Sequence, residues 1–110
     1  GGALYNVNAD TLAAALAVRL KAGRLIIAGT TPGVLDAGGR TIAELASEAE
    51  QALAKAGTVT RGMLAKLHAC RAAREGGVRD VVIVDGRDES RLGAALAGSE
   101  RAAGWMTRIN

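Results

Sequence analysis

Two short apolar runs constrain the fold of this chain more than any other feature: RLIIAG at residues 24–29 and RDVVIVD at residues 79–85. The middle of each run is a continuous series of Leu, Ile, Val or Ala, without alternating polar residues. Alternation is typical of strands covered on one face, whereas continuous apolar strands are typical of parallel sheets buried on both faces. The two runs therefore predict neighbouring strands with helices on each side.

An alanine- and leucine-rich segment before the first run predicts a helix over residues 9–22. Asn8 or Asp10 is suited to cap its start, because side-chain oxygens at this position accept backbone amide hydrogens. Gly23 is the expected cap at its end.

A second helix is expected to begin at Thr41, because its spacing from Glu44 matches a capping box, and to end near residue 56, before Gly57. Further helices are expected at residues 61–75 and 90–97, and a third strand is expected at residues 105–110.

Strands that alternate with helices indicate an α/β fold with a mainly parallel sheet, arranged as a three-layer αβα sandwich. At 110 residues, the whole chain (1–110) is expected to be a single domain. Three strands make a narrow sheet with bare edges, which favour pairing with another chain. We therefore expect part of a larger sheet, and a homo-oligomer. The start at Gly1 rather than Met leads us to expect a piece of a longer polypeptide.

Composition disfavours several functional classes. Fourteen basic and eleven acidic residues are interspersed, and aromatic residues make up only 2%. Nucleic-acid binding proteins usually have a basic stripe with aromatic residues for stacking, so we expect no such partner. No apolar run approaches the ~20 residues of a membrane span, and we expect a cytoplasmic protein without a membrane partner. The single cysteine, Cys70, is expected to be buried.

Two segments could bind a phosphate. The loop TTPGVLDAGG, residues 30–39, follows the first predicted strand, and ligands of open parallel sheets bind at such ends. Thr60 and Arg61 begin a predicted helix, whose free amides attract anions. The loop could equally be an ordinary turn, and Lys66 could extend to solvent instead of reaching a phosphoryl group. His68 and Cys70 point to opposite sides of a helix, and no metal site is predicted.

Several motifs occur together in order: YNVNADTLAAALA, a Thr-x-Gly-Val-Leu-Asp loop, GRTIAEL, and TVTRGMLAKLHACRAAREGGVRDVVIVDGR. This series resembles the C-terminal half of acetylglutamate kinase, of the amino acid kinase family, over nearly the whole chain. The resemblance implies an open αβα sandwich whose C-terminal half holds the nucleotide. It implies transfer of the γ-phosphoryl group of MgATP to the γ-carboxylate of N-acetyl-L-glutamate, in arginine biosynthesis. An N-terminal half with a first lysine would complete the site.

The resemblance also implies roles for individual residues. Lys66 and Asp10 would be catalytic, with Asp10 organising two lysines and Lys66 stabilising the transferred phosphoryl group. Asn6 and Asn8 would contact the acetylglutamate substrate. An extended backbone would direct Asn6, Asn8 and Asp10 to the same side. The nucleotide would contact Thr30, Thr31, Pro32, Gly33, Val34, Leu35, Thr58, Val59 and Thr60.

One departure keeps other functions open. Thr30 stands where the family usually has an aspartate, and kinase-like domains of acetylglutamate synthases can lack this aspartate too. A non-catalytic ligand-binding or regulatory domain is therefore one alternative. Another is a kinase acting on aminoadipate in lysine biosynthesis.

Overall fold

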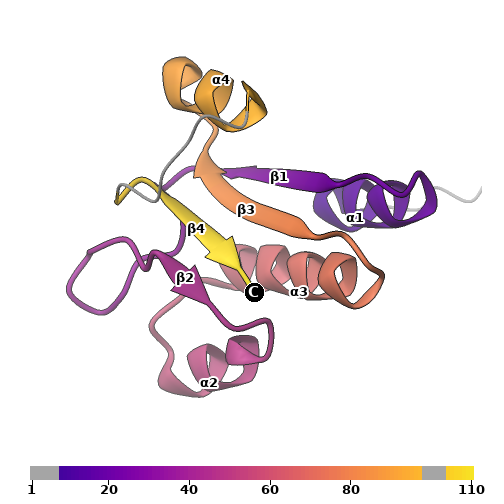
Figure 1. The fold of residues 1–110 in the computed structure, drawn as a ribbon. Helices are drawn as coiled ribbons and strands as arrows, with labels where there is room; N and C mark the ends of the chain where they lie inside the picture. The colour runs from indigo at the N-terminus through magenta and orange to yellow at the C-terminus, as the bar shows by residue number, and fades with distance from the viewer. Residues whose placement is uncertain (1–7, 98–103) are drawn as a thin grey trace, which may run out of the picture.

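A computed structural model describes residues 8–97 and 104–110 and arranges their strands in one sheet with the order β1-β3-β4-β2 (Figure 1). β1 and β3 are parallel and in register along their full lengths, so that Gly29 lies beside Asp85. β2 and β4 are also parallel, whereas β3 and β4 pair in the antiparallel direction. The strands are β1 (Arg24–Gly29), β2 (Glu44–Leu45), β3 (Asp80–Asp85) and β4 (Met106–Ile109).

Helices cover both faces of this sheet, which confirms the three-layer α/β prediction. Alternate residues separate the faces: Leu25 and Ile27 of β1 pack with α1 and α3, whereas Ile26 packs on the side of α4. Val82 and Val84 of β3 share that second side with Ala95 of α4. The helices are α1 (Ala9–Arg19), α2 (Ala49–Ala56), α3 (Arg61–Glu75) and α4 (Glu89–Ala97), and α2 lies against α3.

The predicted helix start at Thr41 is wrong, because this segment is used in tertiary contacts. The Thr41 hydroxyl donates to the carbonyl of Pro32 at 2.7 Å instead of capping a helix. Glu44 belongs to strand β2, and the backbone on either side of it pairs with β4 through Arg108 and Asn110. The sheet therefore has a fourth strand that was not predicted, and α2 begins only at Ala49.

The first helix ends earlier than expected. Its C-cap is Leu20, and Lys21 takes a positive φ of 54°, so Gly23 does not act as the cap. Gly76 ends α3 next to this region, and a Cβ at Gly76 would collide with the side chain of Val18. The glycine therefore allows the C-terminal ends of α1 and α3 to pack closely.

β1 forms one edge of the sheet, since within the described residues it pairs only with β3. An exposed parallel edge strand is a template for another chain. We therefore expect the isolated protein to self-associate, with an apparent mass that rises with concentration in size-exclusion chromatography with light scattering. A single monomeric mass at the highest concentrations would contradict this expectation.

Candidate functional site

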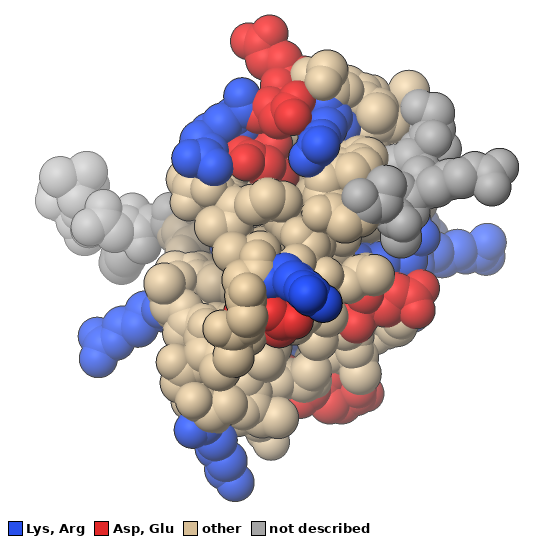
Figure 2. Space-filling view, turned by 90° about the vertical axis from the view of Figure 1, so that its left-hand side faces the viewer, with Lys and Arg blue, Asp and Glu red and all other residues tan. Residues whose placement is uncertain are grey.

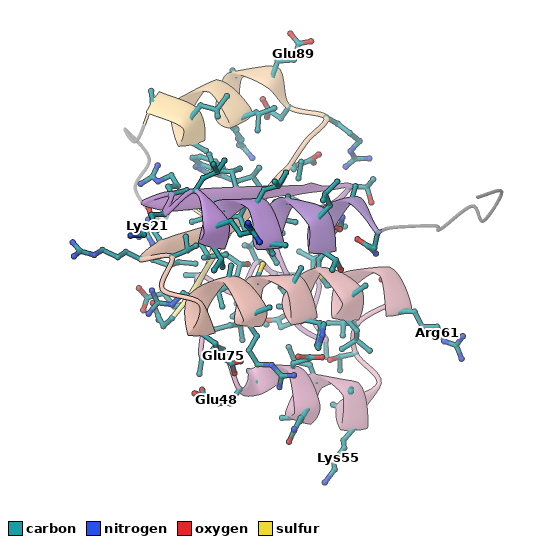
Figure 3. All side chains as sticks on the ribbon, turned by 90° about the vertical axis from the view of Figure 1, so that its right-hand side faces the viewer. Lys21, Glu48, Lys55, Arg61, Glu75 and Glu89 are labelled. Carbon is teal, nitrogen blue, oxygen red and sulfur yellow. The ribbon has the colours of Figure 1, made fainter. Side chains whose placement is uncertain are left out.

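Two helix–strand connections bring the N-terminal ends of α1 and α3 together. Each helix is followed after a few residues by a strand that it packs against, so it runs back along that strand. Its N-terminal end must then lie near the strand's carboxyl end. In Figure 3, Arg61 marks this end of the molecule, and Lys21 and Glu75 mark the opposite one.

An ion pair between the two helices occupies this end. Lys66 Nζ lies 2.8 Å from Asp10 Oδ2, and the two side chains are 23% and 20% exposed. The stem of Lys66 crosses the end of β1, because a Cβ built on Gly29 would be 3.5 Å from Lys66 Cε. The two residues predicted to be catalytic therefore meet, although 56 positions separate them in the sequence.

A cavity of about 250 Å³ opens beside the ion pair. Six of the predicted nucleotide-binding residues line it together with Lys66, whereas Pro32, Gly33 and Val34 do not. Gly62 and Met63 also line it; they stand shortly before Lys66 in the TVTRGMLAK part of the family motif but were not predicted as binding residues. The lining residues are Thr30, Thr31, Leu35, Thr58, Val59, Thr60, Gly62, Met63 and Lys66.

The N-terminal end of α3 forms one side of this Lys66 cavity. The Thr60 side chain caps the helix by accepting from the Met63 amide at 3.1 Å. First-turn amides and the helix dipole favour anions at such an end. Arg61 itself points away from the body of the protein (Figure 3). The groups at the cavity that can attract an anion are therefore the Lys66 ammonium group, which is paired with Asp10, and the helix end.

The asparagine-rich segment is only partly as predicted. Asn8 is the N-cap of α1, and its Oδ1 accepts from the amides of Asp10 and Thr11 at 2.8 and 3.4 Å. Asp10 lies in the first helical turn, so the predicted extended row of three side chains is wrong at this position. Asn6 lies outside the described residues.

The carboxylates at this edge of the sheet are paired with cations. Asp10 binds Lys66, and Asp85 at the end of β3 binds Arg87 through both oxygens at 3.1 and 3.0 Å. The hydrogen bonds from Arg87 hold the pKa of Asp85 below its ordinary value. Across residues 8–97 and 104–110, no three His, Cys, Asp or Glu side chains gather as they would around a metal ion.

Cys70 is fully buried behind the ion pair, as predicted. Burial, and then the charge of Asp10, raises the pKa of its thiol to about 12. At pH 8 such a thiol is about one part in ten thousand ionised, against roughly a quarter for a thiol in water. Because the thiolate is the nucleophile, we expect iodoacetamide to label native Cys70 at least ~100-fold more slowly than the urea-unfolded chain, as followed by mass spectrometry.

The same pKa predicts a loss of stability in alkaline solution. The unfolded thiol loses its proton from about pH 9, whereas the folded thiol keeps it to about pH 12. The stabilisation is therefore complete below pH 9 and is lost as the pH rises towards 12. Cys70→Ala should remove this contribution, and fast labelling of the native protein would contradict both expectations.

On the face drawn in Figure 2, basic side chains lie beside acidic ones rather than forming one continuous patch. None of the described helices has both the length and the apolar character needed to cross a bilayer.

Comparison with known proteins identifies the family. Residues 1–85 match the amino acid kinase family. The chain belongs to this family. The match includes α1, α3, the Lys66–Asp10 pair and strands β1 to β3, and it ends before α4 and β4.

The relatives are considerably longer than this chain. It is 45% identical to the acetylglutamate kinase of Rhizobium etli (strain CIAT 652) over 86 residues, which are 78% of this chain and 29% of that kinase. It is 43% identical to the acetylglutamate kinase of a Nitratiruptor species over 87% of this chain and 34% of that kinase. The chain thus spans about a third of each.

A solved structure extends the likeness to the whole fold. The N-acetylglutamate synthase of Neisseria gonorrhoeae, complexed with coenzyme A and N-acetyl-glutamate, superimposes with a TM-score of 0.77. It is 29% identical, and the match covers 99% of this chain and 24% of that one.

Proposed function

We propose that this chain is the nucleotide-binding part of an acetylglutamate kinase-like phosphotransferase. The observation that carries the proposal is the ion pair between Lys66 and Asp10 at the rim of the Lys66 cavity. A lysine held by an aspartate beside a helix N-terminus suits a phosphoryl group, because phosphoryl transfer depends mainly on positioning and charge stabilisation. The 45% identity to an acetylglutamate kinase supports this choice of reaction.

Each residue then has a task within the site. The Lys66 ammonium group binds the transferred phosphoryl group, and Asp10 holds that ammonium group at the end of β1. The hydroxyls of Thr30, Thr31 and Thr60 border the nucleotide. Asn6 contacts the N-acetyl-L-glutamate acceptor, while Asn8 acts by starting the helix that carries Asp10.

Among the described residues that line the Lys66 cavity there is no carboxylate, so Mg²⁺ would arrive with ATP and be held mainly by its phosphates. Mg²⁺ commonly binds substrate phosphates with only one or two carboxylates and several waters. Asp10 and Asp85 are already bound to Lys66 and Arg87, so neither is a free ligand in this arrangement. When bound, the ion would neutralise charge on the phosphates.

A second candidate is a ligand-binding domain without catalysis. Thr30 lines the cavity where the family usually has an aspartate, and the synthase structure matches nearly the whole chain. A further candidate is a kinase whose acceptor is aminoadipate. The residues that would select the length of the acceptor belong to the part of the relatives that this chain does not match.

Isothermal titration calorimetry with MgATP, N-acetyl-L-glutamate and aminoadipate tests these proposals. Binding of MgATP supports the kinase, and the preferred acceptor separates acetylglutamate from aminoadipate. A protein that binds N-acetyl-L-glutamate but does not bind MgATP would favour the non-catalytic domain. A folded sample, judged by circular dichroism, that binds none of these ligands would contradict the proposed function for this chain.

We expect the chain alone to show no phosphoryl transfer. The Lys66 cavity, at about 250 Å³, is smaller than typical ligand pockets of ~300–1,000 Å³, so other residues must complete it. A coupled ADP-release assay should give the same rate for the wild type and Lys66→Ala. A wild-type rate above that of the variant would contradict this expectation. Grafting the 86 residues that match the Rhizobium etli kinase into that kinase supplies the remaining fold for comparison.

A further inference from the structure

Thr107 of β4 is a fully buried polar residue whose hydroxyl binds another segment of the chain. It accepts a hydrogen bond from the Val34 amide at 2.8 Å and donates one to the Ile42 carbonyl at 2.6 Å. Both partners belong to the 30–42 loop, which follows β1 and borders the Lys66 cavity. The hydroxyl therefore joins this loop to the last strand of the sheet.

The two partners face each other across a small hairpin within this loop. Leu35 and Thr41 form an antiparallel bridge, and the Asp36 amide donates to the Arg40 carbonyl on one side of it. On the other side, the Ile42 amide donates to the Val34 carbonyl at 2.8 Å. Residues at such a position normally exchange two direct hydrogen bonds. Here the second direct hydrogen bond, from the Val34 amide to the Ile42 carbonyl, is replaced by two: the amide donates to the Thr107 hydroxyl, and the hydroxyl donates to the carbonyl.

The neighbouring glycine brings the loop and the strand into close contact. Gly33 has a φ of +74°, and a Cβ at this position would lie 2.5 Å from Thr107 Oγ1 and 2.7 Å from the Thr107 amide nitrogen. Thr31 precedes this contact and Leu35 follows it, and both line the cavity. Gly33 and Val34, which contact Thr107, thus connect two residues of the cavity wall along the chain.

We propose that Thr107 is a positioning residue that sets the shape of the cavity wall through its hydroxyl. The proposal rests on the proposed function, since it concerns the same nucleotide site. A valine at this position has the same shape but neither donates nor accepts, so the buried Val34 amide and the partly buried Ile42 carbonyl would lose their partner. A serine keeps the hydroxyl. Thr107 itself does not line the cavity.

Thr107→Val and Thr107→Ser, compared with the wild type, separate positioning from stability. Calorimetry measures the MgATP affinity, and NMR measures amide hydrogen exchange at Val34 and Leu35. We expect Thr107→Val to weaken MgATP binding about tenfold or more, equivalent to one lost buried hydrogen bond or more, and to speed Val34 exchange. Thr107→Ser should restore both to near the wild-type values.

Ile109→Val is the matched control, because it removes one methylene group from a buried residue of the same strand and the same core cluster as Val34 but leaves the hydrogen bonds of Thr107 in place. It should lower the unfolding midpoint without changing the affinity or the exchange at Val34. If Thr107→Val does not fold, Thr107→Ala, which leaves space for a water molecule, is used in the same comparison.

Two results are decisive. Thr107→Val with wild-type exchange at Val34 and Leu35, and with no more loss of affinity than Ile109→Val, overturns the positioning role. A wild-type protein that binds no MgATP contradicts the proposed function instead. In that case the exchange data alone decide whether Thr107 shapes the wall.

Discussion

Lys66→Ala is expected to weaken MgATP binding by about 10- to 150-fold, which corresponds to the loss of one hydrogen bond to a charged group. The Lys66 ammonium group is the cation that lines the cavity, and it is only 23% exposed, so bulk solvent does not replace it fully. Isothermal titration calorimetry measures the affinity. Circular dichroism before each titration shows that the variant is folded.

Lys55→Ala is the control for this experiment. Lys55 lies on α2 and points away from the protein into solvent (Figure 3). The variant has the same change in net charge but leaves the ion pair with Asp10 intact. Equal weakening by the two variants would mean that only net charge matters, and it would remove the argument for a phosphate site at Lys66.

Gly33→Ala is expected to lower the free energy of unfolding by about 3 kcal/mol or more, a larger loss than Gly39→Ala should cause. A non-glycine residue at positive φ costs roughly 1–2 kcal/mol, and the new Cβ would also lie 2.5 Å from Thr107 Oγ1. That contact has little freedom to relax, because Thr107 is fully buried and hydrogen bonded on both sides. Urea unfolding followed by circular dichroism measures the change.

Gly39→Ala separates the contact from the backbone effect. Gly39 has a similar φ of +80°, but a Cβ there would have no neighbour within 4 Å. We expect this variant to lose only the ~1–2 kcal/mol of the backbone conformation. Similar losses at the two glycines would mean that the packing of the loop on β4 contributes little.

The parts of the fold that depend on local sequence were predicted. The continuous apolar runs predicted β1 and β3 to within one residue, and the third predicted helix has the expected bounds, from the Thr60 cap to Glu75. The segment from Thr41 to Glu44 was mistaken for a helix start, because its local spacing fits a cap. The Thr41 hydroxyl instead binds the Pro32 carbonyl, and the backbone at Glu44 pairs with β4. No local sequence pattern reveals these distant partners.

In the candidate site too, some residues were predicted from sequence and others depend on distant contacts that the sequence does not reveal. Asp10 and Lys66 were predicted from a family resemblance, and the structure brings them within 2.8 Å of each other. Strand β2 is two residues long, too short for any periodicity to be recognised. Thr107 could not be found from sequence either, since a single threonine in a four-residue strand has no pattern that identifies its partners.

The Thr107 contacts also have a consequence for the order of folding. They join residues 65 and 73 positions apart, whereas each helix–strand unit, α1–β1 or α3–β3, is built from neighbouring residues. Distant contacts require closure of a longer loop and tend to form more slowly than local ones. The ion pair between Lys66 and Asp10 is itself a distant contact, since 56 positions separate the two residues. Both the ion pair and the wall held by Thr107 therefore form only after the helix–strand units have come together, so ligand-binding competence is gained late in folding.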